Sequence, residues 1–274
     1  MSDFLAEMSR ASSLRARNAR GRAKVGGLAS RVESAPPPVG LQLALPGFDV
    51  IAEAKLSSPS GGRLVGGDPG TDEVVALALG FIGTGAAALS ILTEPTRFSG
   101  SLEHLRAVSS ATAAPVMRKD FLVDPVQVLE ARAAGASGVL LIARMLPGEL
   151  LVEMTDQSLD LGMFALVEVF DRSDLERAVG VFGREVLVGV NCRDLVTLQV
   201  DTTRFEVMAP HLPDHLPAVA ESGISSEAEV AAVSAAGYRM ALVGSSLVSG
   251  QDPFGKLAAL IGAGRDALAR VDGG

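Results

Sequence analysis

The chain has 274 residues, of which 48% are hydrophobic and 20% charged, and its formal net charge is −8 at pH 7. This surplus of acid argues against a general nucleic-acid binder or a protein that binds anionic membranes, because both partners require basic surface. The single cysteine, Cys192, excludes an internal disulfide framework and fits a reducing compartment, so we expect a cytoplasmic protein.

The N-terminal part of the chain contains a strongly basic segment. Residues 10–31 hold six Arg and Lys24 but no Asp or Glu, which faintly resembles an organellar transit peptide. The early acids Asp3 and Glu7 and the helical spacing of Phe4, Leu5 and Met8 favour a folded surface helix instead. The proline-rich stretch at 35–40 predicts stiff, non-helical chain that ends this extension.

The longest uncharged run, from Val74 to Leu92, approaches the ~20 residues of a membrane span. Gly80, Gly83 and Gly85 interrupt it. The run therefore predicts a helix that ends at glycine, a tight turn and a buried strand, and we expect no membrane partner.

Short apolar runs then recur along the chain, as expected for strands that are covered on both faces. They predict strands at 49–55, 86–92, 114–119, 138–142, 164–169, 185–191, 217–222 and 240–245. The amphipathic stretches between them predict helices at 72–82, 102–109, 125–134, 147–161, 173–181, 203–211, 226–236 and 253–269. Several of these helices begin with capping residues, such as Asp124 before a proline and Ser226 with Glu229 three residues later.

The spacing of the strands selects a fold. Successive strands begin about 27 residues apart, which suits a strand-helix unit with a right-handed crossover. Eight such units favour a closed α/β barrel, the (β/α)8 or TIM barrel, over an open doubly wound sheet. We expect an N-terminal helical extension at 1–48 that packs a helix over one end of a barrel domain at 49–274.

Polar residues gather where these predicted strands end, the position at which such barrels carry their chemistry. The strand ends carry Glu53 and Lys55, Arg118 to Asp120 with Lys119 between them, Glu168, Asn191 with Arg193, Glu221 to Gly223, and Gly244 with Ser245. Charged groups at several strand ends favour a site, because burying an unpaired ion is costly. The alternatives are a structural ion network, a solvated corner at Lys119 and a loop-capping amide at Asn191.

Other motifs narrow the chemistry. The glycine-bearing corners at 221–225 and 243–248 follow the seventh and eighth strands, where barrels often bind phosphate, so we expect a phosphorylated substrate. Cys192 lacks an activating base and is expected to be inert, and the three histidines lack metal-ligand spacing. Neither a P-loop nor a dinucleotide-binding glycine motif is present in the sequence.

Seven stretches together resemble the indole-3-glycerol phosphate synthase family. They are IAEAKLSSPSGG (51–62), LSILTEPTRFSGSLEHL (89–105), PVMRKDFLVDPVQVLEARAAGASGVLLI (115–142), ALVEVFDRSDLERA (165–178), VGVNCRDLVTLQVD (188–201), and VAESGIS (219–225) with ALVGSSLV (241–248). The resemblance implies a (β/α)8 carboxy-lyase that converts 1-(2-carboxyphenylamino)-1-deoxyribulose 5-phosphate into indole-3-glycerol phosphate, CO2 and water in tryptophan biosynthesis. It implies no metal and no organic cofactor.

The resemblance also implies roles for individual residues. Lys119 resembles the general acid, Glu168 its acid/base counterpart, and Lys55 the cation that grips the substrate carboxylate. Glu53 and Asn191 resemble supporting groups, and Glu221 resembles the residue that engages the anilino nitrogen. The residues aligned with substrate and phosphate contacts are Ser58, Arg193, Ser222, Gly223, Gly244 and Ser245. Those aligned with the walls of an aromatic-ring pocket are Phe98, Phe121, Leu140, Leu195 and Leu198.

The sequence departs from the family pattern after the first strand, where Leu56 and Gly61 stand at positions that are often basic. Lys55 therefore has fewer cationic neighbours. Three rivals to the main hypothesis are a sister barrel such as phosphoribosylanthranilate isomerase, a paralogue in specialised indole metabolism, and a catalytically silent barrel. Cys192 lies in the wrong place for the isomerase. We expect a monomer or weak homodimer that takes a small phosphorylated substrate and no nucleic acid.

Overall fold

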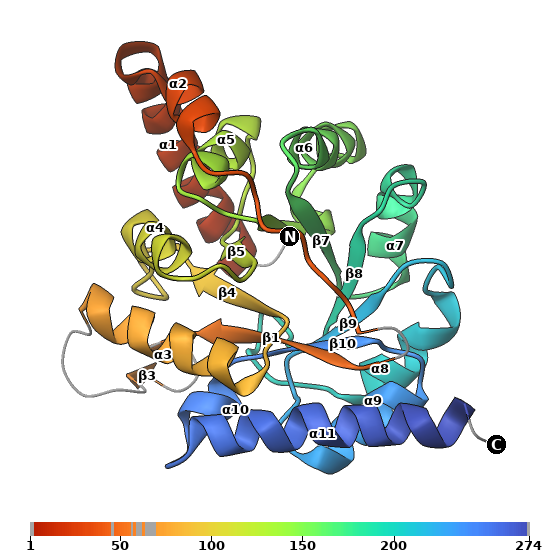
Figure 1. Cartoon of the computed structure of the whole chain (residues 1–274). Helices are drawn as coiled ribbons and strands as arrows, with labels where there is room; N and C mark the ends of the chain where they lie inside the picture. Colours follow the sequence, from red (N-terminus) through yellow and green to blue (C-terminus); the bar gives the residue numbers. More distant parts are fainter. Residues whose placement is uncertain (1–2, 45–46, 56, 59–61, 64–69, 273–274) are drawn as a thin grey trace.

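A closed barrel of eight parallel strands forms the centre of the molecule (Figure 1). The computed structural model describes residues 3–44, 47–55, 57–58, 62–63 and 70–272. The strands follow one another around the barrel in the order β1, β10, β9, β8, β7, β6, β5, β4. Their bounds are β1 Asp49–Ala54, β4 Ala88–Leu92, β5 Val116–Lys119, β6 Gly138–Ile142, β7 Phe164–Val169, β8 Leu187–Asn191, β9 Ala218–Glu221 and β10 Met240–Val243. The predicted (β/α)8 fold is confirmed.

Helices alternate with these strands and surround them. Their bounds are α1 Asp3–Gly26, α2 Leu28–Ser34, α3 Thr71–Thr84, α4 Leu102–Ala111, α5 Pro125–Ala133, α6 Gly148–Asp160, α7 Arg172–Ala178, α8 Thr203–Met208, α9 Glu227–Ala235, α10 Ser245–Val248 and α11 Pro253–Asp272. Short 3-10 turns are η1 Ala143–Met145, η2 Val179–Val181 and η3 Ala209–His211. The side chains of Asp124 and Ser226 cap α5 and α9 by accepting backbone N–H groups, as predicted. The uncharged run from 74 to 92 divides at Gly85, whose φ of 104° ends α3 before β4.

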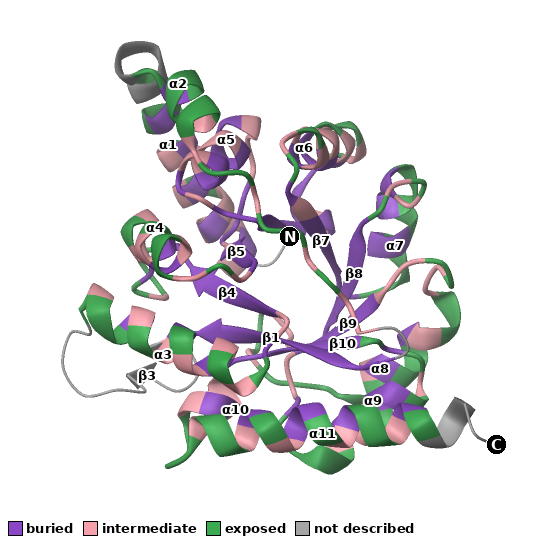
Figure 2. Cartoon of the chain, viewed as in Figure 1, coloured by how far each residue is buried: buried purple, intermediate pink, exposed green. Residues whose placement is uncertain are grey.

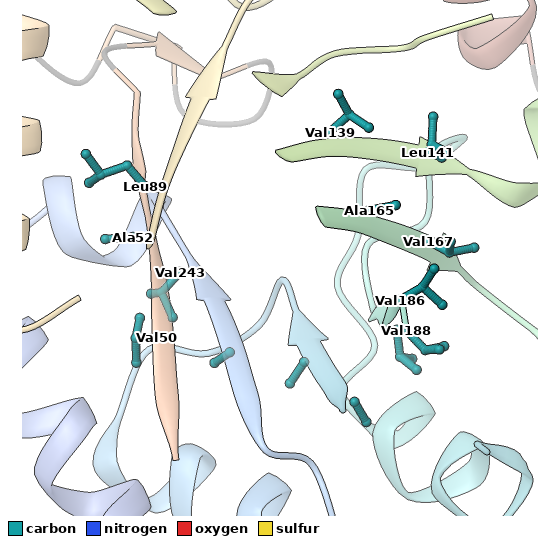
Figure 3. Close-up of a cluster of buried hydrophobic side chains, with 14 of the residues drawn as sticks. Val50, Ala52, Leu89, Val139, Leu141, Ala165, Val167, Val186, Val188 and Val243 are labelled. Carbon is teal, nitrogen blue, oxygen red and sulfur yellow. The ribbon is translucent and has the colours of Figure 1, made fainter. Parts of the chain in front are cut away.

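Each barrel strand buries both of its faces, which explains why the strands read as continuous apolar runs. Val139 and Leu141 project from one side of β6 into the layer between strands and helices (Figure 3). Leu140 and Ile142 belong instead to the apolar cluster inside the barrel. The helices bury the face that meets the strands and expose the other (Figure 2). Each large apolar side chain buried in this way stabilises the fold by roughly 1.5–3 kcal/mol.

The extension contacts both ends of the barrel. Leu5 and Met8 of α1 join the internal apolar cluster beside Phe121, which follows β5 at the carboxyl end of the strands. The chain then crosses to the other end, where the backbone N–H of Val39 donates to Ser137 just before β6 at 3.1 Å. Leu41 and Leu43 pack against the internal cluster there. A helix over one end is therefore only part of the arrangement, because residues 36–44 cover the opposite end.

A two-stranded antiparallel hairpin, β2 Ser57–Ser58 with β3 Gly62–Arg63, follows β1. The sequence patterns do not predict it, since each of its strands has only two residues. Leu56 and Gly61, where the sequence departs from the family pattern, lie outside the described residues, as does the side chain of Ser58. None of the helices in the described ranges combines the length and apolar character that a membrane crossing requires.

Candidate active site

A cavity of about 450 Å³ opens at the carboxyl ends of the barrel strands. The sequence-predicted residues that line it are Glu53, Lys55, Phe98, Lys119, Phe121, Leu140, Glu168, Asn191, Arg193, Leu195, Glu221, Ser222, Gly223, Gly244 and Ser245. These residues come from six of the barrel strands and from the segments that follow β1, β4, β5, β8, β9 and β10. The fold thus brings together groups that lie up to 192 positions apart in the sequence.

Lys119, the last residue of β5, lies between two carboxylates. Its Nζ is 3.0 Å from Oε2 of Glu221 and 3.6 Å from Oε2 of Glu168. Burial alone would lower the pKa of Lys119, but the charges of Glu221, Glu168 and Glu53 raise it above its ordinary value. The amine is therefore protonated at neutral pH and directed at the cavity, where it can donate a proton.

Glu221, the last residue of β9, also has a raised pKa, which for a carboxyl group favours the neutral form. Burial, together with the negative charge of Glu168, raises the pKa of Glu221 to about 8, although Lys119 opposes the change. A Cβ on the neighbouring Gly189 would collide with Oε1 of Glu221, so glycine on β8 provides the space for this carboxylate. The same Oε1 is buried and has no hydrogen-bond partner among the described residues.

Lys55 and Glu53 form a second pair at the end of β1, with Nζ of Lys55 2.9 Å from Oε1 of Glu53. Burial would raise the pKa of Glu53, but the charges of Lys55 and Lys119 lower it below its ordinary value. A Cβ on Gly244 would crowd this carboxylate, so Gly244, like Gly189, makes room for an acid. Glu53 consequently remains ionised and holds the Lys55 ammonium at the rim.

Asn191 ends β8 and orders the loop after it, because its Oδ1 accepts the backbone N–H of Arg193 at 2.9 Å. Arg193 in turn donates from Nη1 to the carbonyl oxygen of Leu198 at 3.0 Å. Leu198 has a positive φ of 61° and is not among the residues that line the cavity, so the structure does not bring it together with the rest of the predicted ring pocket. The tight turn presents its backbone to Arg193, while Leu195 and Val200 supply the cavity wall.

Hydroxyl groups gather on the side of the cavity formed after β9 and β10. The serines that line this side are Ser222, Ser225, Ser245, Ser246 and Ser249. Ser222 and Gly223 both have positive φ, 64° and 86°, and the side chains of Val200 and Thr202 leave no space for a Cβ on Gly223. Such a glycine-bearing, hydroxyl-rich corner suits an anionic oxygen group.

The opposite side of the cavity is apolar. Phe98 and Phe121 lie with their ring centroids 6.0 Å apart, and Leu140 and Leu195 complete the predicted wall. Sequence reasoning missed Leu92, Ile142 and Leu242, which also line the cavity. The alternation of strand faces could have found Ile142, because it lies two residues after Leu140. This side can hold a flat aromatic group.

Two further observations concern groups that the site does not use. Within the described ranges, no group of three or more His, Cys, Asp or Glu side chains is arranged to hold a metal ion. Cys192 is buried in the outer apolar cluster, and burial raises the pKa of its thiol to about 12, as expected for an inert cysteine.

The sequence of the chain is similar to that of named proteins. A family model described as indole-3-glycerol phosphate synthase matches residues 10–260. The indole-3-glycerol phosphate synthase of Mycolicibacterium smegmatis is 45% identical over 237 residues, which cover 85% of each chain. That of Mycobacterium tuberculosis (strain CDC 1551 / Oshkosh) is 44% identical over 234 residues, 84% of each chain.

Solved structures with low sequence identity share the fold. The 3-hexulose-6-phosphate synthase from Salmonella typhimurium is 11% identical with a TM-score of 0.63, and the match covers 79% of this chain and 98% of that one. A phosphoribosyl anthranilate isomerase, solved with reduced 1-(o-carboxyphenylamino)-1-deoxyribulose 5-phosphate, is 16% identical with a TM-score of 0.53 and the same coverage. At these identities the likeness concerns the barrel alone.

Proposed function

The chain belongs to the indole-3-glycerol phosphate synthase family, and we propose how its cavity residues divide the work of that reaction. The enzyme is a carboxy-lyase that converts 1-(2-carboxyphenylamino)-1-deoxyribulose 5-phosphate into indole-3-glycerol phosphate, CO2 and water. The protonated Lys119 between Glu168 and Glu221 carries the proposal, because both bond-making and dehydration require a proton donor inside the cavity.

The substrate lies with its aromatic ring between Phe98, Phe121 and Leu140 and its phosphate toward Ser222, Gly223, Gly244 and Ser245. The apolar and hydroxyl-rich sides of the cavity support this orientation. Lys55 meets the ring carboxylate, with Glu53 holding the ammonium in place. Arg193 and Asn191 face the sugar hydroxyls, and Glu221 Oε1, which is unpartnered among the described residues, accepts the anilino N–H.

Ring closure forms a bond from the carboxyl-bearing ring carbon to the ketone carbon, and Lys119 gives a proton to the ketone oxygen as this bond forms. The bond to the carboxyl group then breaks, CO2 leaves, and its electron pair restores the aromatic ring. Lys55 must orient the carboxylate without binding it too tightly, since ground-state stabilisation would slow this loss.

Dehydration completes the indole. The new hydroxyl takes a second proton and leaves as water, and a base removes one proton from the adjacent CH2 carbon. Glu168, buried and 3.6 Å from Lys119, can exchange protons with the lysine between these steps. Overall one proton is consumed, and the electron pair of the departing carboxylate balances it.

Turnover by the purified protein tests this proposal. The chain contains no tryptophan, so indole fluorescence of the product is observed without a protein background. Lys119→Ala is expected to lower kcat/KM by about 10²–10⁴-fold, the usual contribution of a general acid. Lys256→Ala on α11, away from the cavity, is the matched control and is expected to behave as the parent chain. A folded parent protein that yields no indole product would contradict the proposal and favour a silent barrel.

A further inference from the structure

Arg15, on helix α1 outside the barrel, bridges two buried carboxylates at the edge of the cavity. Its Nη2 lies 2.6 Å from Oδ1 of Asp120, and its Nη1 lies 3.5 Å from Oε1 of Glu94. Glu94 follows β4 and Asp120 follows β5, and both side chains are almost completely buried. One guanidinium therefore connects the extension to the loops after two neighbouring strands.

Glu94 organises the loop that carries Phe98. Its carboxylate accepts the backbone N–H of Thr96 at 3.0 Å, of Arg97 at 2.7 Å and of Phe98 at 3.3 Å. A buried carboxylate that accepts several backbone donors fixes the conformation of the segment between them. The position of Phe98 at the cavity wall consequently depends on Glu94.

Asp120 acts in the same way on the second phenylalanine. Its Oδ1 accepts the backbone N–H of Phe121 at 2.8 Å, and its Oδ2 accepts Thr93 Oγ1 at 2.8 Å and Arg118 Nη2 at 3.0 Å. Each carboxylate that Arg15 contacts thus holds the backbone amide of one cavity-lining phenylalanine. The α1 residue Phe4 also contacts Phe121 edge to face, with ring centroids 5.9 Å apart.

We propose that Arg15 is a positioning residue for the aromatic ring of the substrate, because it sets the spacing of Phe98 and Phe121 through Glu94 and Asp120. The proposal rests on the reaction proposed above, which places an aromatic ring between these two side chains. Arginine suits this task, since its planar fork meets two carboxylates at once, whereas a lysine ammonium is a single point charge. The expected consequence is an effect on substrate affinity at the ring end.

A second arginine of α1 provides a matched control. Arg20 pairs with Asp124 at 2.8 Å, so it also ties the extension to the barrel, but the pair is more exposed and lies at the cap of α5. Arg20→Gln removes a docking contact of α1 without touching Glu94 or Asp120. A change that follows from looser docking of the helix would therefore occur in both variants.

The experiment compares the parent chain with Arg15→Gln, Arg15→Lys and Arg20→Gln. Steady-state KM and kcat are measured with the carboxyphenylamino deoxyribulose phosphate, and inhibition constants with anthranilate for the ring end and inorganic phosphate for the other end. Arg15→Gln is expected to raise KM and the anthranilate constant by about tenfold, with kcat and the phosphate constant within about threefold. Arg15→Lys is expected to be intermediate, and Arg20→Gln to stay within about twofold of the parent.

Either of two results would overturn the inference: a KM for Arg15→Gln within twofold of the parent value, or an equal rise for Arg20→Gln. If Arg15→Gln does not fold, Glu94→Gln replaces it, because the amide leaves only one oxygen for the backbone donors, and the same KM threshold applies. Absence of turnover by the parent chain would instead refute the proposed reaction. The anthranilate and phosphate constants, measured by calorimetry, would still decide the role of Arg15.

Discussion

Two layers of side chains inside the barrel differ sharply although the same strands supply them. The deeper layer is apolar and includes Ile51, Met117, Leu166 and Val219, all buried in the internal cluster. Two residues later on each of those strands stand Glu53, Lys119, Glu168 and Glu221, which line the cavity. Because strand side chains alternate with a period of two, both members of each pair face the barrel interior.

The two layers have different tasks: the deeper layer stabilises the barrel, and the upper layer carries the charged groups of the site. The deeper layer closes the barrel to water and lies beneath the charged layer, so the upper charges are desolvated on one side. Desolvation strengthens their mutual interactions, which explains the opposite pKa directions at Glu53 and Glu221. The apolar residues of the deeper layer thus contribute to the shifted pKa values of the charged residues above them.

The largest expected effect is a loss of stability when the deeper layer is changed. Ile51→Ala removes most of a fully buried side chain two residues before Glu53 and leaves a cavity, so the free energy of unfolding should fall by about 2–5 kcal/mol. Urea denaturation measures this loss. Activity at a temperature where the variant remains folded should stay within about fivefold of the parent value. A larger loss of activity than of stability would show that the deeper layer takes a direct part in catalysis.

The next largest effect is a loss of activity when a carboxylate of the upper layer is displaced while every charge is kept. Gly189→Ala places a methyl group against Oε1 of Glu221 and close to Leu166, so the carboxylate must move away from Lys119. We expect kcat/KM to fall by about 10²-fold, the cost of misplacing a catalytic group by roughly 1 Å. Gly183→Ala is the matched control, since a Cβ there meets open space. Equal activity of the two variants would contradict the steric role of Gly189.

A smaller effect concerns pH. The pKa of Glu221 is about 8 in the fold and near its ordinary value of 4.5 in the unfolded chain. Between these values the folded state holds a proton that the unfolded state has lost, so this group makes the protein less stable as pH rises. The slope is at most about 1.4 kcal/mol per pH unit.

Glu221→Gln should remove this dependence, so the variant gains stability relative to the parent as pH rises from 5 to 8. Urea denaturation at several pH values measures the difference. Glu227→Gln, an exposed carboxylate on α9, is the control and should run parallel to the parent curve. A constant difference between Glu221→Gln and the parent across this range would refute the raised pKa.

Much of the charged layer could be predicted from the sequence because it depends on local order. Six of the eight predicted strands carry polar or glycine-serine residues at or just after their ends, and parallel strands in a barrel bring all such ends to one mouth. This rule placed Lys119 and Glu221 together although 102 positions separate them. The same reasoning gave the caps at Asp124 and Ser226, since capping requires only neighbouring residues.

Other features depend on contacts that no local pattern contains. Arg15 reaches Asp120 across 105 positions, and nothing in the basic segment distinguishes it from the arginines around it. The resemblance places Leu198 in the ring pocket, whereas Leu195 and Val200 line the cavity and Leu198 occupies a turn position with positive φ. Covering of the far end of the barrel by Leu41 and Leu43 likewise follows from the path of the extension rather than from its sequence.

The smallest expected effect tests whether two adjacent residues, Asn191 and Cys192, face opposite sides of the barrel wall. Asn191 lines the cavity, whereas Cys192 is fully buried in the outer cluster with Phe205 and Tyr238. Cys192→Ala should therefore leave kcat/KM within about twofold and cost about 1 kcal/mol of stability, as a small outer cavity does. With its thiol pKa raised to about 12 by burial, Cys192 should resist iodoacetamide at pH 8 in the folded protein and react once urea unfolds it. Rapid labelling of the folded protein with loss of activity would place Cys192 at the cavity and contradict the placement of Asn191 and Cys192 on opposite sides of the barrel wall.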